Sequence, residues 1–121
     1  MQVTRHTDGA TTERSGEALF QGNVWGRTLA GAPESEHINA AIVNFAPGAR
    51  TRMHQHTHDQ LLYIVHGIGK VGTASEEYTV GVGDMVVVPA REDHWHGAGD
   101  TGSPMAHLTI TPAESQTTIT D

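Results

Sequence analysis

Three histidines and a glutamine have the types and the spacing of ligands for a metal ion. His54 and His56 lie two residues apart in a stretch typical of a β-strand, where alternate side chains share a face, so both imidazoles can point into one cavity. Gln60 follows the turn at 57–59, and His94 opens a later strand. Imidazole nitrogens with an oxygen donor suit manganese, iron, cobalt, nickel, copper and zinc. A lone His-x-His pair is also common on protein surfaces, so the pair alone does not establish a metal site, and the spacing of the surrounding residues has to be considered.

Three of the other histidines are further candidates for the same site. His58 lies between the expected ligands and is an alternative to Gln60 as the fourth one. His96 shares a strand face with His94, so it points either into the same cavity or into a hydrogen-bonded position of the core. His107 lies on the last expected strand, where a buried histidine is either structural or part of the site. The remaining histidines of the nine are expected in solvent: His6, His37 and His66.

The elements that must position these residues are short strands. Strand-like runs recur every eight to twelve residues between turn signals, which is typical of an all-β sandwich or barrel. No window keeps a helical period over three turns, so we expect little or no helix. The expected strands are 20–29, 37–45, 50–56, 60–65, 70–73, 77–80, 85–88, 94–96 and 105–111. The expected turns are 47–48, 66–67, 81–84, 89 and 97–104.

Two of these runs, 61–65 and 85–88, are apolar at every position. A strand that is apolar on both faces has both faces covered. The second cover is either the chain's own opposing sheet and terminal arm or a second copy of the chain, and we expect a homodimer. With 121 residues the chain has room for one domain. We expect a polar N-terminal arm (1–16), a single barrel domain (17–112) and a polar C-terminal tail (113–121).

Composition excludes several classes of function. Acidic residues outnumber basic ones 14 to 7, and the few cations are scattered, which argues against binding nucleic acid. There is no cysteine, so disulfides, thiolate nucleophiles and zinc–thiolate sites are excluded. No apolar run resembles a signal peptide or reaches the length of a membrane span. We therefore expect a cytoplasmic protein with a small-molecule substrate, and no partnership with nucleic acid or membrane.

The spacing of glycines and expected ligands resembles the two signature motifs of the cupin superfamily. Intervals of five, one, three and six residues separate Gly48, His54, His56, Gln60 and Gly67. Intervals of five and four residues separate Gly83, Pro89 and His94. The resemblance covers about residues 38–111. It implies a double-stranded β-helix, or jelly-roll barrel, with one divalent metal ion inside its mouth on His54, His56, Gln60 and His94.

Three positions depart from the cupin motifs. A glutamate is usual in place of Gln60, a glycine in place of Arg91 and an asparagine in place of Ala98. The last two concern loop and turn geometry. The neutral amide leaves the full charge of a divalent ion on the site, which makes the ion a stronger Lewis acid, and it removes a carboxylate base. Gln60 can still be a ligand through its amide oxygen.

The stretches 47–51, 89–98 and 105–108, with the ligand set, resemble small bacterial cupins related to manganese-dependent hydroxynitrile lyases. The resemblance favours Mn(II), with Fe(II), Zn(II), Ni(II) or Co(II) as alternatives. It implies that the ion polarises the hydroxyl of a cyanohydrin while His107 accepts its proton and cyanide leaves. His96 is the second candidate catalytic residue. The alternatives are an Fe(II)-type dioxygenase and a non-catalytic protein that binds a small ligand on its metal.

Overall fold

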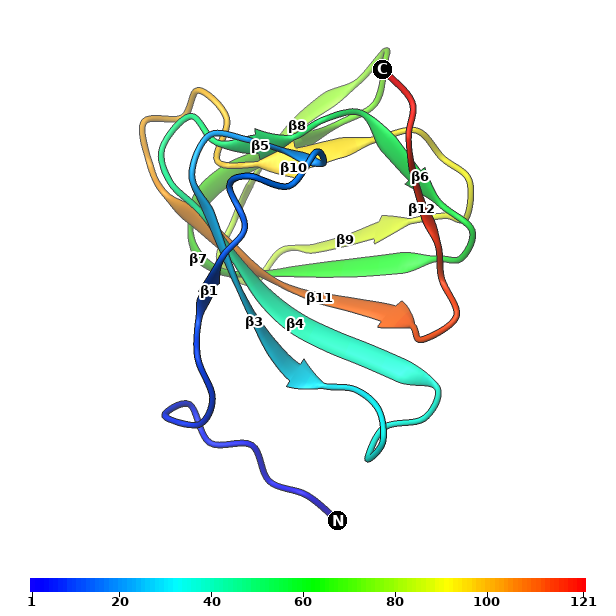
Figure 1. Cartoon of the computed structure of the whole chain (residues 1–121). Coiled ribbons are helices and arrows are strands. Elements are labelled where there is room, and N and C mark those ends of the chain that lie inside the picture. The colour runs from blue at the N-terminus through cyan, green and yellow to red at the C-terminus, as the bar shows by residue number, and fades with distance from the viewer.

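All 121 residues are described by a computed structural model, in which every regular element is a β-strand (Figure 1). The expected all-β fold without helix is therefore confirmed, and no helix capable of spanning a membrane is found. The strands are β1 (Thr12–Glu13), β2 (Phe20–Gln21), β3 (Val24–Ala30), β4 (Ile38–Phe45), β5 (Arg50–Thr51), β6 (His54–His56), β7 (Gln60–Gly72), β8 (Glu77–Gly81), β9 (Met85–Val88), β10 (Trp95–Gly97), β11 (Met105–Pro112) and β12 (Thr117–Ile119).

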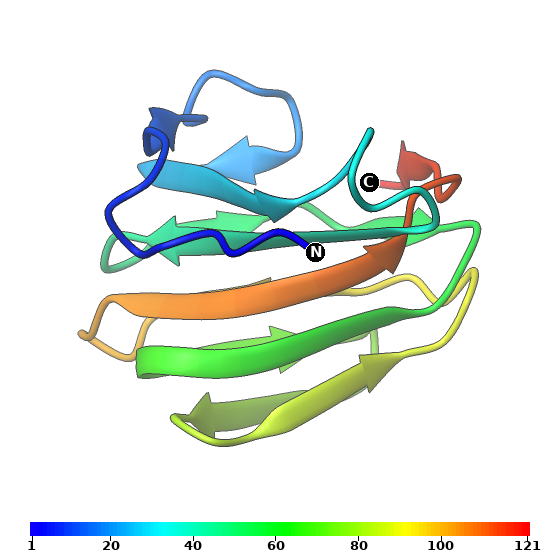
Figure 2. The same ribbon diagram turned by 90° about the horizontal axis from the view of Figure 1, so that it is seen from below.

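The strands form one curled antiparallel sheet that makes two facing layers, as in a jelly roll (Figures 1 and 2). One layer holds β1, β3, β4, β11 and β9, and the other holds β2, β5, β10 and β8. Strand β7 belongs to both layers, because its first half pairs with β9 and β11 and its second half with β8 and β10. The separate pair of β6 and β12 stands at the right-hand end of the barrel in Figure 1.

The turn expected at 66–67 is wrong, because β7 runs unbroken from Gln60 to Gly72. Gly67 has φ +71°, a conformation that glycine adopts without strain, and a Cβ at this position would clash with the carbonyl oxygen of Pro104. This glycine therefore lets one long strand bend from the first layer into the second. The sequence shows only the glycine, and a tight bend inside a strand has the same local signal as a turn.

The single strand expected at 20–29 is divided into β2 and β3. Between them Gly22 has φ +84°, and a Cβ there would lie 2.9 Å from the Cα of Ala49. This close approach lets β2 pair with β5 in one layer, while β3 pairs with β4 in the other. The C-terminal segment carries β12, which pairs with β6 from Thr117 to Ile119.

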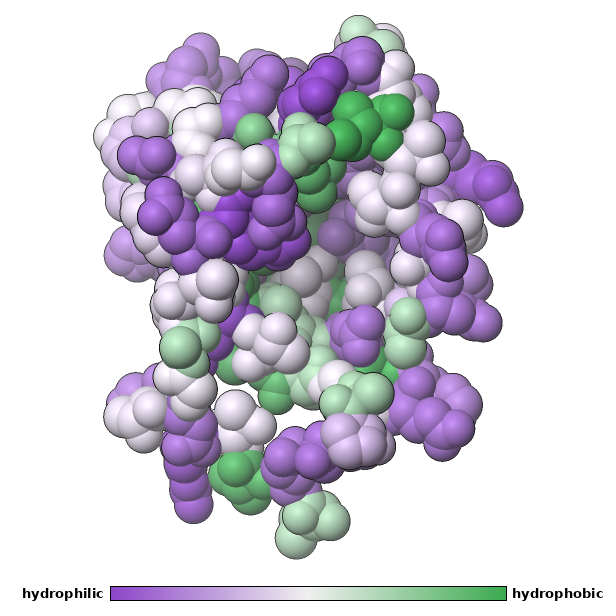
Figure 3. Space-filling model, in the orientation of Figure 1, coloured by the Kyte–Doolittle hydropathy of each residue, from purple (hydrophilic) through white to green (hydrophobic).

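The inner faces of the two layers enclose a small apolar core, including Phe20, Val43, Phe45, Ile64 and Met105. Beside this core the molecule is hollowed: Figure 3 shows a depression between the upper and lower layers, with hydrophobic side chains at depth and hydrophilic ones around the rim. The barrel therefore leaves room inside one end, where functional groups can be held.

Each of the two fully apolar strand segments faces the core with one side and is exposed on the other. Leu62, Ile64 and Val88 are buried between the layers, whereas Tyr63 and Val87 are 39% and 62% exposed on the outer side of the same strands. Cross-strand pairs align these outer side chains into rows, for example Leu61 opposite Val87. The chain's own second layer thus covers only the inner face, and the homodimer remains a prediction.

Candidate metal centre

The three expected histidine ligands come together at the end of the barrel. His54 and His56 point inward from the same face of β6, and both are buried. His94, just before β10, is brought opposite His54 by two backbone hydrogen bonds of 2.9 Å, in which each residue's N–H donates to the carbonyl of the other. One ring nitrogen from each of the three residues lies within 4.8 Å of the others, close enough to bind one metal ion.

Backbone carbonyls fix the tautomers of two of these rings. Nδ1 of His54 lies 2.7 Å from the carbonyl of Arg52, and Nδ1 of His94 lies 2.9 Å from the carbonyl of Glu92. Because a carbonyl only accepts, each Nδ1 carries the hydrogen, and in the neutral ring Nε2 keeps a lone pair. Nδ1 of His56 lies 2.8 Å from the hydroxyl of Thr117. Such partners are what orient metal-binding histidines in proteins.

Gln60, at the start of β7, turns its amide oxygen toward the histidines. Oε1 lies 3.0 Å from Nε2 of His56 and 3.2 Å from Nε2 of His94. The amide nitrogen donates to the hydroxyl of Thr109 at 2.8 Å, which orients the oxygen inward. The oxygen donor expected beside the three nitrogens is therefore in place to act as a ligand.

Burial keeps all three imidazoles uncharged at neutral pH. Burial first, then the neighbouring His94, lowers the pKa of His54 to about 3. Burial also lowers the pKa of His56 and of His94. A neutral imidazole is the form that binds a metal, so no proton has to leave these rings at neutral pH.

The donor set fits a divalent metal ion. Nε2 of His54 is buried, bears a lone pair and has no hydrogen-bond partner in the chain. A buried polar atom without a partner costs free energy unless a bound group satisfies it. Three neutral nitrogens and one amide oxygen suit first-row transition metals, with geometry and availability deciding among them. The chain therefore has a three-histidine site that can hold a metal.

His96 and His107 form a second group beside the cluster. Nδ1 of His96 and Nε2 of His107 are 2.9 Å apart, and both residues are buried. Their outer nitrogens, Nε2 of His96 and Nδ1 of His107, have no partner in the chain. His96 lies between His107 and the cluster, with its ring centroid 5.4 Å from that of His54. Burial lowers the pKa of His107 to about 4 and that of His96 well below its usual value, with His107 the next cause.

The remaining histidines lie away from the cluster. His58, the alternative to Gln60, sits in the loop with Nε2 3.4 Å from Glu114 and Nδ1 2.8 Å from the hydroxyl of Thr57. It is not among the residues that converge on one point. The three histidines expected in solvent are indeed exposed: His6, His37 and His66.

The loop before His94 is tied to the cluster. The backbone N–H of Arg91 donates to the carbonyl of His56 at 2.7 Å, and that of Ala90 donates to the Asp59 carboxylate at 2.9 Å. Arg91 has φ +67° and is the one residue other than glycine with positive φ. This conformation explains why a glycine is usual at this position of the motif.

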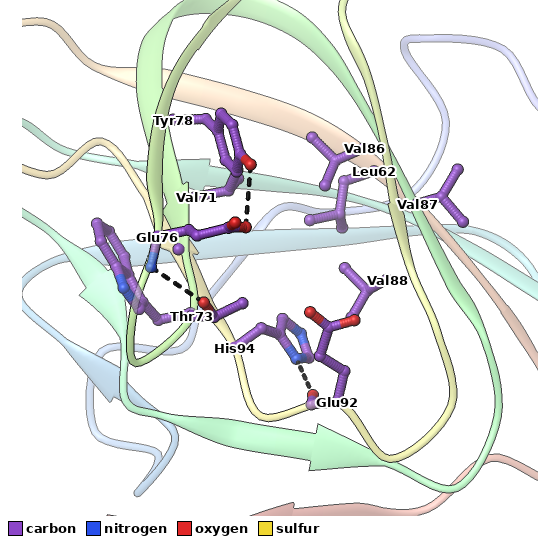
Figure 4. Close-up of a pocket in the computed structure, with 12 residues that line it drawn as sticks. Leu62, Val71, Thr73, Glu76, Tyr78, Val86, Val87, Val88, Glu92 and His94 are labelled. Atoms are coloured by element: carbon purple, nitrogen blue, oxygen red, sulfur yellow. Dashed lines mark hydrogen bonds between the residues drawn. The ribbon is translucent and has the colours of Figure 1, made fainter.

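Two cavities adjoin the histidines. The smaller, of about 80 Å³, is lined by His54, His56, Gln60, His96 and His107. The larger, of about 230 Å³, lies between β8 and β9 and reaches only His94 among the histidines (Figure 4). In Figure 4 Val86 and Val88 of β9 lie on one side of this larger cavity, and Tyr78 and Glu76 lie on another.

Several residues of the site were not found from the sequence. Thr109 lies two residues after His107 on the same strand face, so the period of the strand was a usable signal. Thr117 lies in the polar tail, where no local pattern connects it to His56. The same holds for Leu19 and Phe20, which line the smaller cavity from the N-terminal side.

Comparison with known proteins identifies the family. The model of the cupin domain matches residues 41–111. Over 94 residues, covering 75% of this chain and 70% of the other, the sequence is 40% identical to (R)-mandelonitrile lyase of Granulicella tundricola. A cupin-like protein of Thermotoga maritima superposes with a TM-score of 0.80 at 26% identity, over 89% of this chain and 85% of that one. A polyketide cyclase of Streptomyces resistomycificus shares the fold, with a TM-score of 0.83 at 18% identity over 100% and 86% of the two chains. The chain belongs to the cupin family.

Proposed function

We propose that this chain is a metal-dependent lyase that splits a cyanohydrin into a carbonyl compound and hydrogen cyanide. The observation that carries the proposal is the pair of His96 and His107 in the same cavity as the three-histidine cluster. Two more buried, uncharged imidazoles are more than a protein that only binds a ligand on its metal requires. The 40% identity to (R)-mandelonitrile lyase supports this class of reaction.

The expected ligands are the residues that would hold the ion. When bound by His54, His56, His94 and Gln60, a divalent ion supplies a Lewis acid for the hydroxyl oxygen of the substrate. All four ligands are neutral, so they leave the charge of the ion uncompensated. We propose Mn(II), with Fe(II), Zn(II), Ni(II) and Co(II) as alternatives.

The histidine pair can both accept and return a proton. If Nε2–H of His107 donates to His96, then Nδ1 of His107 is a free acceptor and Nε2–H of His96 a free donor. In the opposite tautomer the two roles are exchanged. Either way the pair offers one free lone pair and one free N–H, which is what a relay of one proton needs.

The proposed reaction balances in one turnover. His107, as the proton acceptor of the pair, takes the proton from the substrate hydroxyl, and the C–O bond becomes a carbonyl while the bond to the nitrile carbon breaks. Cyanide leaves with that electron pair and receives a proton from the pair. The low pKa of His107 keeps it uncharged before each turnover, and a weak base returns its proton readily.

The test is cyanide release by the metal-loaded protein. Protein purified without added metal and then loaded with Mn(II) is given mandelonitrile and acetone cyanohydrin in mildly acidic buffer, where both are stable. We expect cyanide release from at least one of them, loss of the activity on chelation and its return with Mn(II). Failure of a loaded site to cleave any cyanohydrin would refute the proposal. Uptake of dioxygen by the Fe(II)-loaded protein would then favour a dioxygenase.

A further inference from the structure

We infer that Thr117, in the C-terminal strand β12, is a positioning residue that lets His56 change its tautomer when a metal ion binds. The inference rests on the metal-binding part of the proposed function and does not depend on the reaction that is catalysed. Nδ1 of His56 lies 2.8 Å from the hydroxyl of Thr117, and Nε2 of the same ring lies 3.0 Å from the amide oxygen of Gln60. These two contacts distinguish His56 from the other two histidines of the cluster.

The other two rings of the cluster are held in one tautomer. His54 and His94 each face a backbone carbonyl with Nδ1, at 2.7 Å and 2.9 Å, and Figure 4 shows this hydrogen bond for His94. A carbonyl oxygen only accepts, so the hydrogen of each neutral ring is on Nδ1 with or without a metal ion. Their Nε2 atoms therefore have a lone pair for the ion in both states.

His56 faces an acceptor with its other nitrogen. Without a metal ion, the amide oxygen of Gln60 can accept a hydrogen bond only from His56, because Nε2 of His94, 3.2 Å from the same oxygen, has no hydrogen. The oxygen is held in this orientation, since the amide nitrogen donates to the hydroxyl of Thr109 at 2.8 Å. We therefore expect His56 of the metal-free protein to carry its hydrogen on Nε2, with Nδ1 as an acceptor.

Metal binding requires the opposite tautomer of His56. To act as a ligand, the ring has to offer the lone pair of Nε2, so the hydrogen of the neutral ring has to be on Nδ1. One proton then leaves Nε2 to water and another joins Nδ1, and the ring stays neutral. His54 and His94 need no such change, because their hydrogens are already on Nδ1.

A hydroxyl can serve both tautomers of the ring. The hydroxyl of Thr117 donates to Nδ1 of His56 in the metal-free protein and accepts from Nδ1–H in the loaded protein, which needs only a rotation of the hydroxyl. A carbonyl in its place would exclude the metal-free tautomer, and an apolar group would leave Nδ1 without a partner in both states. Thr117 can therefore hold the ring in one orientation while the hydrogen of the ring changes sides.

The pairing of β12 with β6 holds Thr117 in this position (Figure 1). Thr117 is directly opposite His56 in the register. Next to this pair, the N–H of Thr57 donates to the carbonyl of Gln116 at 2.9 Å, and the N–H of Gln116 donates to the hydroxyl of Thr57 at 3.0 Å. Apart from one isolated bridge, β12 is the only strand that pairs with β6. The C-terminal strand therefore belongs to the proposed metal site.

NMR of the protein with 15N-labelled histidine tests the change of tautomer. The 15N chemical shift distinguishes a ring nitrogen that carries a hydrogen from one that does not, and diamagnetic Zn(II) serves as the metal ion. We expect Nε2–H for His56 without metal and Nδ1–H with Zn(II), whereas His54 and His94 should be Nδ1–H in both states. A His56 ring that is Nδ1–H in the metal-free protein, or that keeps Nε2–H with Zn(II) bound, would overturn the inference.

Variants of the C-terminal strand test the role of Thr117. Thr117→Val keeps the shape of the side chain and leaves no room for a water molecule at Nδ1, so the loaded ring loses the acceptor of its N–H. The Mn(II) affinity measured by calorimetric titration should fall at least tenfold, as for other groups that orient ligands. Thr117→Ser should keep the affinity of the unmodified protein. Thr118→Val should keep it too, because Thr118 is exposed and its side chain points away from the cluster. An unchanged affinity in Thr117→Val, or an equal loss in Thr118→Val, would overturn the inference.

The outcomes separate this inference from the proposed function. If the unmodified protein binds neither Mn(II) nor Zn(II), the metal-dependent function is refuted and the inference with it. If the protein binds metal but cleaves no cyanohydrin, only the proposed reaction is refuted. The tautomer of His56 and the affinity of Thr117→Val then still decide whether Thr117 has the inferred role.

Discussion

The barrel contains two groups of buried histidines that differ in their partners and not in their burial. Each ring of the cluster has Nδ1 fixed by a group that is not a histidine, the carbonyls of Arg52 and Glu92 and the hydroxyl of Thr117. His96 and His107 instead hold each other at 2.9 Å. The same side chain is thus prepared for two chemistries: lone pairs that converge on a metal in one group, and a shared proton in the other.

Burial alone does not separate these roles. It lowers the pKa of His54 to about 3 and that of His107 to about 4, so both groups are uncharged at neutral pH. A carbonyl partner leaves the opposite nitrogen free for a metal, whereas a histidine partner leaves one free acceptor and one free donor in the pair. For these buried histidines, the hydrogen-bond partner of the second nitrogen therefore distinguishes a metal ligand from a proton-transfer group, and the pKa does not.

The largest expected effect comes from removing one member of the pair. His107→Ala should lower the lyase rate about 1,000-fold, within the range of general acid–base catalysis, because the proton acceptor is lost. The metal content should stay that of the unmodified protein, since His107 lies outside the cluster. Rate and metal content are measured on the same samples, with exposed His37→Ala as the control. An unchanged rate in His107→Ala would show that His107 is not the proton acceptor. A loss of bound metal in this variant would show that His107 belongs to the metal site and not to a separate pair.

The pair should also make the metal-free fold sensitive to acid. An unfolded histidine takes up a proton near its usual pKa of 6.5, whereas folded His107 stays uncharged down to about 4. Between these values the unfolded state binds more protons, so stability falls with falling pH, by roughly 3 kcal/mol over the window for this one group. Urea unfolding at several pH values measures it, with His107→Leu as the comparison. A fall equally steep in His107→Leu would show that His107 does not contribute.

A smaller effect should follow from loosening the oxygen ligand. Thr109→Val removes the acceptor that orients the Gln60 amide, so the amide oxygen is no longer held toward the histidines. We expect metal affinity to fall about tenfold, as for other groups that orient ligands. Thr111→Val, two residues further along the same strand, is the control. Calorimetric titration with Mn(II) gives the affinities of both variants. Equal values would show that Thr109 does not orient the Gln60 amide for metal binding.

The smallest effect concerns the loop that carries His94. Arg91 has φ +67°, where a side chain is strained, so Arg91→Gly should stabilise the fold by about 0.5–1 kcal/mol. The neighbouring Ala90 does not have positive φ, and Ala90→Gly should destabilise the fold by a similar amount. Thermal unfolding of the metal-free variants measures both changes. A destabilised Arg91→Gly variant would mean that the arginine side chain compensates for its backbone.

The local part of the fold could be predicted from the sequence, and the long-range part could not. Short runs between turn signals predicted an all-β sandwich or barrel, and the resemblance to the cupin motifs implied the jelly-roll barrel. They did not reveal that Gly67 bends one strand between two layers, because the glycine signal is the same for a bend and a turn. Nor did they reveal that β12 pairs with β6, since that pairing depends on contacts about sixty residues apart in the chain.

The candidate site, too, could be predicted only in part from the sequence. His54 and His56 could be assigned to one face from the strand period, and motif spacing added Gln60 and His94. The bond between His96 and His107 crosses from β10 to β11, strands that do not pair with each other, so no spacing rule predicts it. Arg14 and Phe20 line the smaller cavity together because the Arg14 guanidinium lies over the Phe20 ring, a contact that forms only in the folded chain.

Elemental analysis is the direct test of whether the three-histidine cluster binds a metal ion. The protein and its His54→Ala variant are purified without added metal, incubated with Mn(II), desalted and analysed. We predict about one ion per chain in the unmodified protein and almost none in the variant, because the two remaining imidazoles and the amide no longer surround the ion. An unmodified protein that holds no metal after this treatment, or a His54→Ala variant that holds as much as the unmodified protein, would show that the cluster is not a metal site.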